Sequence, residues 1–413
     1  MQQTHYDIII VGAGISGIGN AYWLRKKCPR KSIAILEARD AIGGTWSLFN
    51  YPGVRSDSDM FTFGYRFKPW TDAQPLSSGE NIKQYLKETV EENQLDQYIH
   101  FGHKMTACNW SSEDNHWELK VATKEGTIQI SSQFLSICTG YYNYKEAYRP
   151  PFEGEETFKG TIIQPQFWPK DLDYQGKKVA VVGSGATAVT LVPSMAQQGA
   201  GHITMIQRSP TYVVTLPNMT GSYLTMQKWM PLTWAFKITR VKNILFQVVS
   251  FNLSMLFPNF MKNFFMKLAA KQLPEGYPVD KHFNPRYNPW KERLCVVPDG
   301  DLFKAISDGK AGVVTGQIKA FNQAGISMEE GTQIDADIIV LATGLKMQLL
   351  GGASISVDGQ PFAIADSMVY KGMMISGLPN FTYSFGYTNA SWTLKVDLTA
   401  NYLCKLIQYM DDH

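Results

Sequence analysis

The chain has 413 residues, of which 44% are hydrophobic, 13% aromatic and 18% charged. At roughly 150 residues per domain this length predicts two or three domains, and the composition excludes a disordered, collagen-like or disulfide-scaffold protein. The 39 basic and 36 acidic residues leave a net charge of +3, so we expect no nucleic-acid partner, because such binding needs a dense positive field.

The cysteines and the first residues bear on the compartment. The five cysteines are scattered and contain no C-x-x-C pair, so neither a disulfide framework nor a zinc site is expected, and we expect no metal cofactor. The N-terminal segment lacks a basic region, and its apolar run ends at a glycine, so no signal peptide is expected. These features predict a cytoplasmic protein in a reducing compartment.

The first predicted element is a strand over 8–11 that runs into Gly12–Gly17 and then into helix-like residues. The three glycines of this G-x-G-x-x-G turn permit, in order, a tight turn, close approach of the backbone to a pyrophosphate, and close packing of helix on strand. A second strand over 33–36 ends in Glu37, 20 residues after the last glycine, where an acid that binds a free ribose hydroxyl belongs. This unit is therefore predicted to bind FAD.

A second unit of the same kind begins with a strand over 178–182, which runs into Gly183–Ala188 with alanine in the third small position. Its partner strand over 203–206 ends in Gln207 and Arg208. Arg208 lies 25 residues after the first glycine, the same spacing that the acid has in the first unit. An uncharged residue followed by arginine suits a ribose 2′-phosphate, so this unit is predicted to bind NADPH.

Two strand-then-glycine segments, 134–140 and 338–344, resemble the ends of flavoprotein strands and frame the second unit. The loop 141–151 is expected to lead from the first unit into the second, and the segment around Thr343-Gly344 is expected to lead back. The predicted fold is α/β, with two Rossmann-like dinucleotide-binding domains, of which the NADPH domain is inserted in the FAD domain. The expected boundaries are 1–145 for the first part of the FAD domain, 146–335 for the NADPH domain and 336–413 for the second part of the FAD domain.

A helical insertion is predicted at about 220–295, within the NADPH domain. Apolar and aromatic residues recur at roughly helical spacing over 229–273, with breaks at Pro231 and Pro258. Polar residues interrupt the apolar run, so a transmembrane helix is not expected. No acidic residue lies within 174–274. Two interpretations of this basic segment stay open. It could contact an anionic membrane surface, or, more simply, it could cover the cofactor domain and attract a phosphorylated ligand.

The stretch Gly43–Asp57 reads G-G-x-W-x4-Y-P-G-x3-D, a pattern too detailed for a generic loop. Together with the two glycine motifs and the segment 207–212, it resembles the class B flavoprotein monooxygenases of the Baeyer–Villiger type. The segments 55–60, 183–193 and 386–395 are similar to a mycobacterial branch of that family. The resemblance covers essentially the whole chain.

Two features depart from the family pattern. The fingerprint F-x-G-x3-H-x3-W-P is present over 158–169, but Gln164 stands in place of the histidine. In the family this histidine lies in the linker between the domains, so its replacement bears on domain coupling more than on flavin binding. The sequence also ends at His413, where relatives continue with a further tail.

The resemblance implies an FAD- and NADPH-dependent monooxygenase that uses O₂ and acts through a C4a-peroxyflavin. Its expected partner is a small-molecule ketone, converted to an ester or lactone, or a thioether or thioamide oxidised at sulfur. Arg293, in the loop 287–298, is expected to stabilise the peroxide anion, Asp57 to orient Arg293, and Arg55 to lie near the flavin. Two alternatives stay open, an uncoupled NADPH oxidase or reductase and a non-catalytic redox sensor that binds both cofactors. The physiological substrate and the oligomeric state are not predicted.

The motifs and the resemblance together give a set of expected cofactor contacts. They lie in the two glycine turns, at the ends of the partner strands and in the strand-then-glycine segments. The set is Gly12, Ala13, Gly14, Ser16, Gly17, Glu37, Gly44, Thr45, Trp46, Asp57, Met105, Thr139, Gly183, Ser184, Gly185, Thr187, Ala188, Arg208, Ser209, Thr343 and Gly344.

Overall fold

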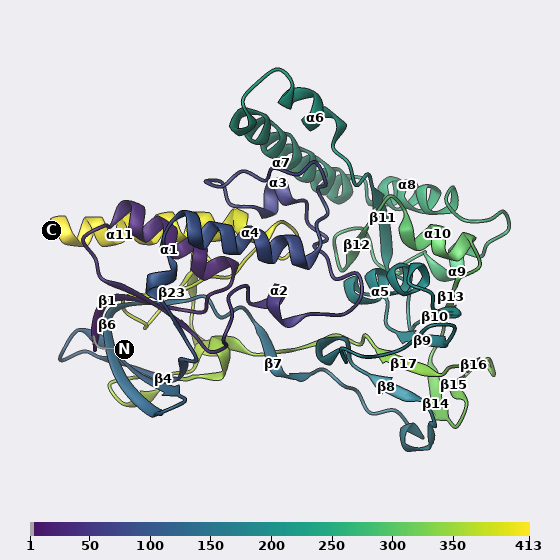
Figure 1. Ribbon diagram of the computed structural model, residues 1–413, viewed down its shortest axis with the longest axis horizontal. Helices are drawn as coiled ribbons and strands as arrows, with labels where there is room; N and C mark the ends of the chain where they lie inside the picture. The colour runs from purple at the N-terminus through teal and green to yellow at the C-terminus, as the bar shows by residue number, and fades with distance from the viewer. Residues whose placement is uncertain (1–3) are drawn as a thin grey trace.

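Two large sheets organise the chain, the first mixed and the second parallel, and the computed structural model describes residues 4–413. Figure 1 shows the first sheet with its helices in the left lobe, the second sheet in the right lobe, and a group of helices along the upper edge. The C-terminal helix α11 (Trp392–Asp412) returns to the left lobe and lies beside α1 (Ile15–Lys27). The fold thus has the two dinucleotide-binding units that the sequence predicts.

The first sheet has nine strands, in the order β20-β19-β4-β5-β6-β1-β2-β3, with β23 also paired with β6. Strand β1 is buried on both faces, which explains its continuous apolar run. Ile8 and Ile10 pack under α1, α4 (Gly79–Glu92) and α11, while Ile9 packs against the tryptophans of β4 and β5. The strands are β1 His5–Val11, β2 Ile33–Glu37, β3 Ile99–Phe101, β4 Lys104–Ser111, β5 His116–Thr123, β6 Gly126–Ile137, β19 Ser354–Val357, β20 Gln360–Pro361 and β23 Phe381–Tyr383.

The second sheet has five parallel strands in the order β13-β10-β9-β17-β8. Val179 and Val181 of β9 pack under α5 (Ala186–Gln197) and α10 (Asp301–Ser307), whereas Ala180 and Val182 pack against the small antiparallel sheet β14-β15-β16. The strands are β8 Thr161–Ile163, β9 Lys178–Val182, β10 His202–Gln207, β13 Ala311–Thr315, β14 Ile318–Asn322, β15 Gly325–Met328, β16 Gln333–Asp335 and β17 Ile338–Leu341.

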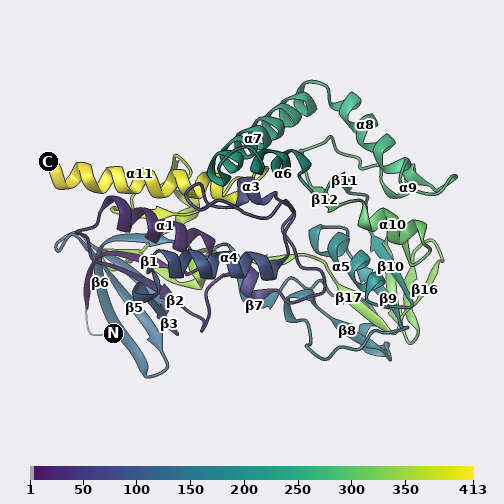
Figure 2. The same cartoon turned by 45° about the horizontal axis from the view of Figure 1, so that its top comes forward.

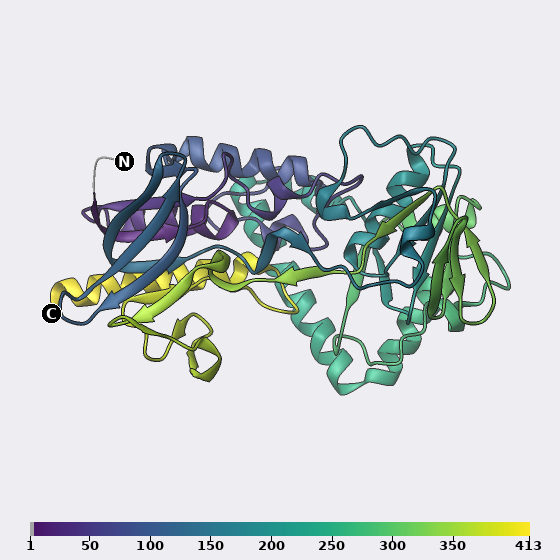
Figure 3. The same cartoon turned by 90° about the horizontal axis from the view of Figure 1, so that it is seen from below.

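Strand β17 corrects the second expected domain boundary. The division at 335/336 assigns residues 338–341 to the FAD domain, but this strand pairs with β9 and β8 in the second sheet. The chain therefore returns to the first unit only after Leu341. The outbound strand β7 (Tyr142–Ala147) and the return strand β18 (Leu345–Met347) pair antiparallel and form a two-stranded link between the lobes, which Figure 3 shows from below.

The helical insertion forms an arch over both units. It consists of α6 (Gly221–Gln227), α7 (Leu232–Leu256), α8 (Pro258–Ala270) and the short α9 (Val279–His282). The expected breaks lie where helices start, because Pro231 is the N-cap of α7 and Pro258 begins α8. Figure 2 shows α7 and α8 as two limbs of an inverted V, and the chain bends by 116° from one helix to the next.

No single helix within residues 4–413 is both long enough and apolar enough to cross a bilayer, and only the bent pair α7 and α8 reaches that length and composition together. The remaining elements are α2 Thr45–Leu48, α3 Met60–Phe63, β11 Tyr212–Leu216, β12 Leu294–Pro298, β21 Val369–Tyr370, β22 Met374–Ile375 and five short 3₁₀ helices at 96–98, 155–157, 165–167, 349–352 and 364–366.

Candidate cofactor and active site

Each glycine-rich turn is packed against the main chain at the end of a neighbouring strand. Gly12 and Gly183 both have a left-handed backbone, with φ of +107° and +138°. A Cβ atom on Gly12 would lie 2.6 Å from the carbonyl oxygen of Cys138, and one on Gly183 would overlap the carbonyl oxygen of Ala342. A Thr-Gly pair follows each of these carbonyls, at 139–140 and 343–344. The two Thr-Gly segments therefore lie beside the two turns, where only glycine fits.

The helices after the two turns begin without a side-chain cap. Gly14 is the N-cap of α1 and Gly185 the N-cap of α5, so backbone amides and the positive end of the helix dipole are available to an anion. Gly14 also faces Gly44, since a Cβ atom on Gly44 would lie 3.3 Å from the Gly14 Cα. This slot without side chains fits the pyrophosphate of FAD, and the start of α5 fits that of NADPH.

Glu37 is a buried carboxylate at the end of β2. Its two oxygens accept hydrogen bonds from the backbone amides of Ala13, at 2.8 Å, and of Arg39, at 2.9 Å. Burial raises the pKa of the Glu37 carboxyl, and these two hydrogen bonds oppose the rise. Each carboxylate oxygen retains capacity for a further hydrogen bond, so the group is fixed in position to accept one from a ribose hydroxyl.

At the corresponding point of the second unit, Gln207 and Arg208 have different environments. Gln207 is buried, and its Nε2 donates to the carbonyl of His282, at 2.7 Å, and to Thr315 Oγ1, at 2.9 Å. The Gln207 amide is thus committed to α9 and β13. Arg208 and the following Ser209 are exposed, which leaves the Arg208 guanidinium available to a ligand.

A cavity of about 1220 Å³ lies where the two units, the arch and the C-terminal segment meet. Typical ligand pockets measure roughly 300–1,000 Å³, so it has room for a cofactor end and a substrate together. Its lining comes from the segment that follows the first dinucleotide motif, the second glycine turn, the arch, the loop of Arg293 and the start of α11. The chief lining residues are Trp46, Asp57, Tyr142, Gly185, Thr187, Asn243, Phe246, Gln247, Trp290, Arg293, Gly344, Asn389 and Trp392.

Asp57 and Arg293 lie on the walls of this cavity. The Asp57 side chain is exposed to the cavity, and desolvation by the surrounding protein raises the pKa of its carboxyl, a rise that the positive charge of Arg293 opposes. The two side chains form no ion pair within 4 Å. Arg293 lies against the start of α5, since a Cβ atom on Gly185 would overlap its Nη1. The hydroxyl of Tyr287 donates to the Arg293 carbonyl at 2.8 Å and fixes the loop. The structure thus brings these two predicted residues into one cavity.

Arg55 lies at the contact between the two units. Its Nη1 is 2.6 Å from Asp301 Oδ2, and both side chains are largely buried. Asp301 begins α10, so the ion pair ties the Y-P-G segment of the first unit to the second unit. Arg55 is not among the residues that line the large cavity. Its expected place near the flavin stays a prediction, and no pattern in the sequence pointed to Asp301 as its partner.

The rest of the Y-P-G segment packs against α5. A Cβ atom on Gly53 would lie 2.6 Å from the Cβ of Ser194, so glycine is needed for this close approach. The Tyr51 hydroxyl lies beside Thr187 at the start of the same helix. Trp46, earlier in the motif, packs edge-on against Phe63. This detailed pattern therefore connects the first glycine turn to the second.

Gln164 borders a small cavity at the link between the units. The cavity measures about 20 Å³, enough for one water molecule, and Tyr51, Thr187 and Ala342 also line it. The Nε2 of Gln164 is buried and has no hydrogen-bond partner. Gln164, which stands in place of the fingerprint histidine, thus has a buried side-chain amide without a hydrogen-bond partner at the link between the domains.

Several other predicted contacts lie around the turns. Met105 is buried in the core beneath the first sheet, so only its main chain is available to a ligand. Ala188 is buried in α5, and the Ser184 hydroxyl pairs with that of Thr211 at 3.0 Å. Thr45 begins α2 beside Tyr144, whose ring lies under Arg39. The roles of these residues toward cofactors stay predictions.

The residues that fasten the arch to the first unit were not predicted from the sequence. Arg240 is buried, and its Nη1 donates to the carbonyls of Phe61, Thr62 and Gly64 at 2.7, 3.2 and 2.8 Å. Asp59 accepts hydrogen bonds from Asn243 Nδ2 at 2.9 Å and from Gln247 Nε2 at 3.0 Å. The helical spacing of these three polar residues on α7 was the available signal.

Two tryptophans at the cavity were also not predicted. The Nε1 of Trp392 donates to Ser16 Oγ at 2.8 Å, so the start of α11 contacts the first turn of α1. Trp290 has φ of +68°, uncommon for a bulky residue, and its buried Nε1 has no partner. The strained backbone of Trp290 lies three residues before Arg293, in the loop that the resemblance assigns to the active site.

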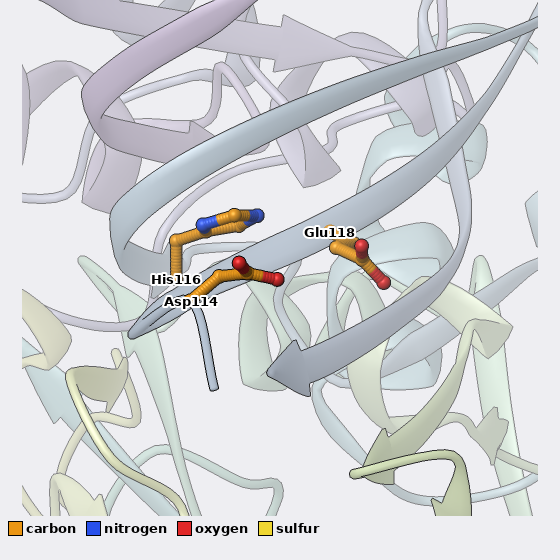
Figure 4. A group of neighbouring side chains, drawn as sticks. All are labelled: Asp114, His116 and Glu118. Atoms are coloured by element: carbon orange, nitrogen blue, oxygen red, sulfur yellow. The ribbon is translucent and has the colours of Figure 1, made fainter. Parts of the chain in front are cut away.

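One group of side chains in residues 4–413 has the spacing of metal ligands. Figure 4 shows Asp114, His116 and Glu118 at the start of β5, and their candidate ligand atoms lie within 4.8 Å of one another. Asp114 and Glu118 are exposed, and such groups are common without an ion. None of the three lines the large cavity, so they have no part in the site.

The comparisons with known proteins cover almost the whole chain. The family model described as "Pyridine nucleotide-disulphide oxidoreductase" matches residues 9–221. The chain is 51% identical to the FAD-containing monooxygenase EthA of Mycobacterium tuberculosis strain H37Rv, over 99% of this chain and 84% of that protein. It is 50% identical to the probable FAD-binding monooxygenase AlmA of Acinetobacter baylyi, over 99% of this chain and 82% of the relative.

Solved structures with the same fold are more distant in sequence. OTEMO in complex with FAD and NADP superimposes with a TM-score of 0.80 at 21% identity, covering 100% of this chain and 87% of that one. An oxidised steroid monooxygenase bound to NADP gives a TM-score of 0.82 at 22% identity, covering 99% and 86%. These similarities confirm the predicted arrangement of the fold.

Proposed function

The chain belongs to the FAD-containing monooxygenases, and from this premise we propose that it uses FAD, NADPH and O₂ to transfer one oxygen atom to a small ketone or to a thioether or thioamide sulfur. The observation that carries the proposal is the single cavity onto which Asp57, Arg293 and the start of α5 all open. The C-x-x-C pair that disulfide chemistry uses does not occur in this sequence.

FAD would lie along the first glycine turn and NADPH along the second. The Gly14–Gly44 slot and the α1 amides bind the pyrophosphate of FAD, and Glu37 accepts a hydrogen bond from its ribose. The start of α5 binds the pyrophosphate of NADPH, and Arg208 binds its 2′-phosphate. When bound, the two cofactors supply hydride transfer and the activation of O₂.

Arg293 would act on the reacting atoms. A permanently charged guanidinium stabilises negative charge that develops on oxygen, and its several donors fix the geometry better than a lysine ammonium would. Asp57 shares the cavity with Arg293 and is electrostatically coupled to it, which supports a role in orienting the guanidinium. Trp46, Tyr142 and Trp392 give the same cavity aromatic walls.

The two domains must be held in register for this reaction. The Arg55–Asp301 ion pair, Gly53 against α5, and Arg240 against α3 all join the NADPH unit or its arch to the FAD unit. We propose that these contacts hold the two units in register around the cavity while the oxygen atom is transferred. The unsatisfied amide of Gln164 would loosen this arrangement at the link between the lobes.

For the location, we propose a cytoplasmic protein that contacts the inner face of a membrane. The five cysteines are free and buried, which suits a reducing compartment, and the acid-free segment 174–274 favours an anionic surface.

The experiment that tests the function is reduction of the FAD-loaded protein by NADPH without O₂, followed by O₂ and a thioether. A monooxygenase reduces its flavin and then yields sulfoxide in proportion to NADPH. An oxidase reduces its flavin but yields only stoichiometric H₂O₂, and a redox sensor shows no appreciable flavin reduction. Either of the last two outcomes would overturn the proposal.

A further inference from the structure

Helix α7 has its polar side turned toward the protein and its apolar side turned outward. On the inner side, Arg240, Asn243 and Gln247 form hydrogen bonds with the first unit. On the opposite side, seven apolar residues recur at three- and four-residue spacing and are between 44% and 71% exposed. A helix that covers a core in water has the reverse pattern. The seven residues are Trp234, Ile238, Val241, Leu245, Val248, Val249 and Leu256.

The neighbouring helices continue this surface. Leu224 on α6, Trp229 after it and three phenylalanines at the start of α8 are also exposed. In Figures 1 and 2 these helices form the outer edge of the molecule, and no other element lies beyond them. We name the exposed apolar side chains of α6–α8 the apolar arch: the seven residues of α7 together with Leu224, Trp229, Phe257, Phe260 and Phe264. Exposed apolar side chains gathered on neighbouring helices in this way mark an interaction site.

The charges around the apolar arch are all positive within its own segment. No acidic residue occurs over 174–274. Exposed lysines lie on α6–α8 and at their ends, namely Lys228, Lys237, Lys242, Lys267 and Lys271. Apolar residues flanked by exposed lysines suit a surface that is apolar inside and anionic at its rim, as a phospholipid bilayer is. A second copy of this face would instead bring lysines against lysines, with no acid on the segment to pair with them.

We propose that the apolar arch docks on a bilayer containing anionic phospholipid, with its apolar side chains in the headgroup region and its lysines on the phosphates. Helices α6–α8, which carry the apolar arch, lie on the bilayer and do not span it. The inner side of α7 cannot face lipid, because buried Arg240 donates three hydrogen bonds to main-chain carbonyls of the first unit. The 116° bend then gives two limbs that follow the outer edge of the protein.

This placement has a consequence for the substrate, which rests on the proposed function. Helix α7 is also a wall of the large cavity, since Asn243, Phe246, Gln247 and Ser250 line it, and Met219 lines it beside α6. The helix that touches lipid on one side therefore borders the site on the other. The substrate class would be apolar ketones or sulfur compounds that partition into the bilayer and enter beside α6 and α7.

The test is sedimentation of the FAD-loaded protein with phosphatidylglycerol vesicles and, separately, with phosphatidylcholine vesicles. We expect binding to phosphatidylglycerol that weakens by about tenfold or more in high salt or on phosphatidylcholine. The triple variant Val241→Ser, Leu245→Ser, Val249→Ser should lose binding by at least about tenfold, because these exposed residues supply apolar contact without lining the cavity. The pair Lys228→Glu and Lys237→Glu should weaken binding to phosphatidylglycerol selectively.

A matched control removes equally exposed apolar residues elsewhere. The triple variant Met368→Ser, Val369→Ser, Tyr370→Ser alters β21, and its vesicle binding should equal that of the unchanged chain. Flavin content and thermal unfolding of each variant show that it is folded. No sedimentation of the unchanged chain, or equal sedimentation of the arch and control variants, would overturn the proposal. Light scattering that shows a dimer lost only in the arch variant, without vesicle binding, would assign the arch to a second copy of the chain. Because sedimentation needs no turnover, a failure of the proposed oxygenation would leave this result unchanged.

Discussion

The guanidinium of Arg293 lies against the backbone of Gly185, so closely that a Cβ atom on Gly185 would overlap Nη1. Gly185 is the second glycine of the second dinucleotide turn and the N-cap of α5. The loop that carries Arg293 thus reaches the point where the pyrophosphate of NADPH is expected to bind. One cation therefore lies both at the expected nucleotide site and on the cavity, where its positive charge lowers the pKa of the Asp57 carboxyl.

The first prediction concerns the pH dependence of flavin reduction by NADPH. Desolvation by the surrounding protein raises the pKa of Asp57, and Arg293 lowers it, so the carboxylate is lost as the pH falls through this raised pKa. If ionised Asp57 is required, kcat/KM falls on the acidic side. Removal of the positive charge in Arg293→Ala raises the pKa of Asp57 further and should move this acidic limb to higher pH. Arg293→Lys keeps the charge and serves as the control with a smaller shift. Identical midpoints in all three proteins would contradict the coupling.

The second prediction concerns the choice of nicotinamide cofactor. Arg208 is exposed at the end of β10, and a charge-assisted contact with the 2′-phosphate is worth about 1.5–3 kcal/mol. Arg208→Ala should therefore lower the preference for NADPH over NADH by a factor of about 10 to 100. The preference is measured as the ratio of the two kcat/KM values. Arg286→Ala, another exposed arginine of the same unit, is the control and should keep the preference. An unchanged ratio in Arg208→Ala would show that another cation binds the phosphate.

The third prediction concerns coupling at the link between the lobes. Gln164 has an unpartnered buried amide beside Tyr51 and Thr187. Gln164→His should hold the domains more firmly and raise the ratio of product to NADPH consumed, with both cofactors still bound. The measurement is product, NADPH and H₂O₂ on the same thioether for both proteins. Equal ratios would remove this residue from the account.

The fourth prediction concerns the attachment of the arch. Arg240→Ala leaves three main-chain carbonyls without their donor and removes a positive charge 3.9 Å from buried Asp397. We expect the free energy of unfolding to fall by about 3–5 kcal/mol, measured by denaturant unfolding. Lys237→Ala, an exposed cation one turn earlier on α7, should change it by no more than about 0.5 kcal/mol. Comparable losses in the two variants would show that Arg240 does not fasten the arch.

The fold was predictable from the sequence where motif and geometry coincide. The two glycine turns, the partner strands and the position of Glu37 follow from residue spacing, because a pyrophosphate at a helix N-terminus constrains all of them together. The boundary near 335 was wrong for a physical reason. Both sheets place a Thr-Gly pair after a buried strand and beside a glycine turn, so the sequence of 338–344 does not reveal which sheet the strand joins.

The contacts between the lobes were harder to predict. The Arg55–Asp301 pair joins residues 246 positions apart, and no local pattern links them. The polar stripe of α7 was visible, but its polar residues were interpreted as interruptions of an apolar run. These polar residues share the face of α7 that points into the protein. Sequence periodicity groups residues on one face of a helix, but it does not show which face is turned inward when both could be buried.

The most direct measurement of the central claim compares the unchanged chain with Arg293→Ala under heavy-isotope O₂, with NADPH and a thioether. The account predicts sulfoxide carrying one labelled oxygen atom for each NADPH consumed by the unchanged chain. In Arg293→Ala, FAD should still bind through the first glycine turn, while product formation falls by about 10²–10³-fold and H₂O₂ replaces product, because a fixed charge beside the reacting oxygen is lost. Unlabelled product, or a full yield of labelled sulfoxide from Arg293→Ala, would contradict it.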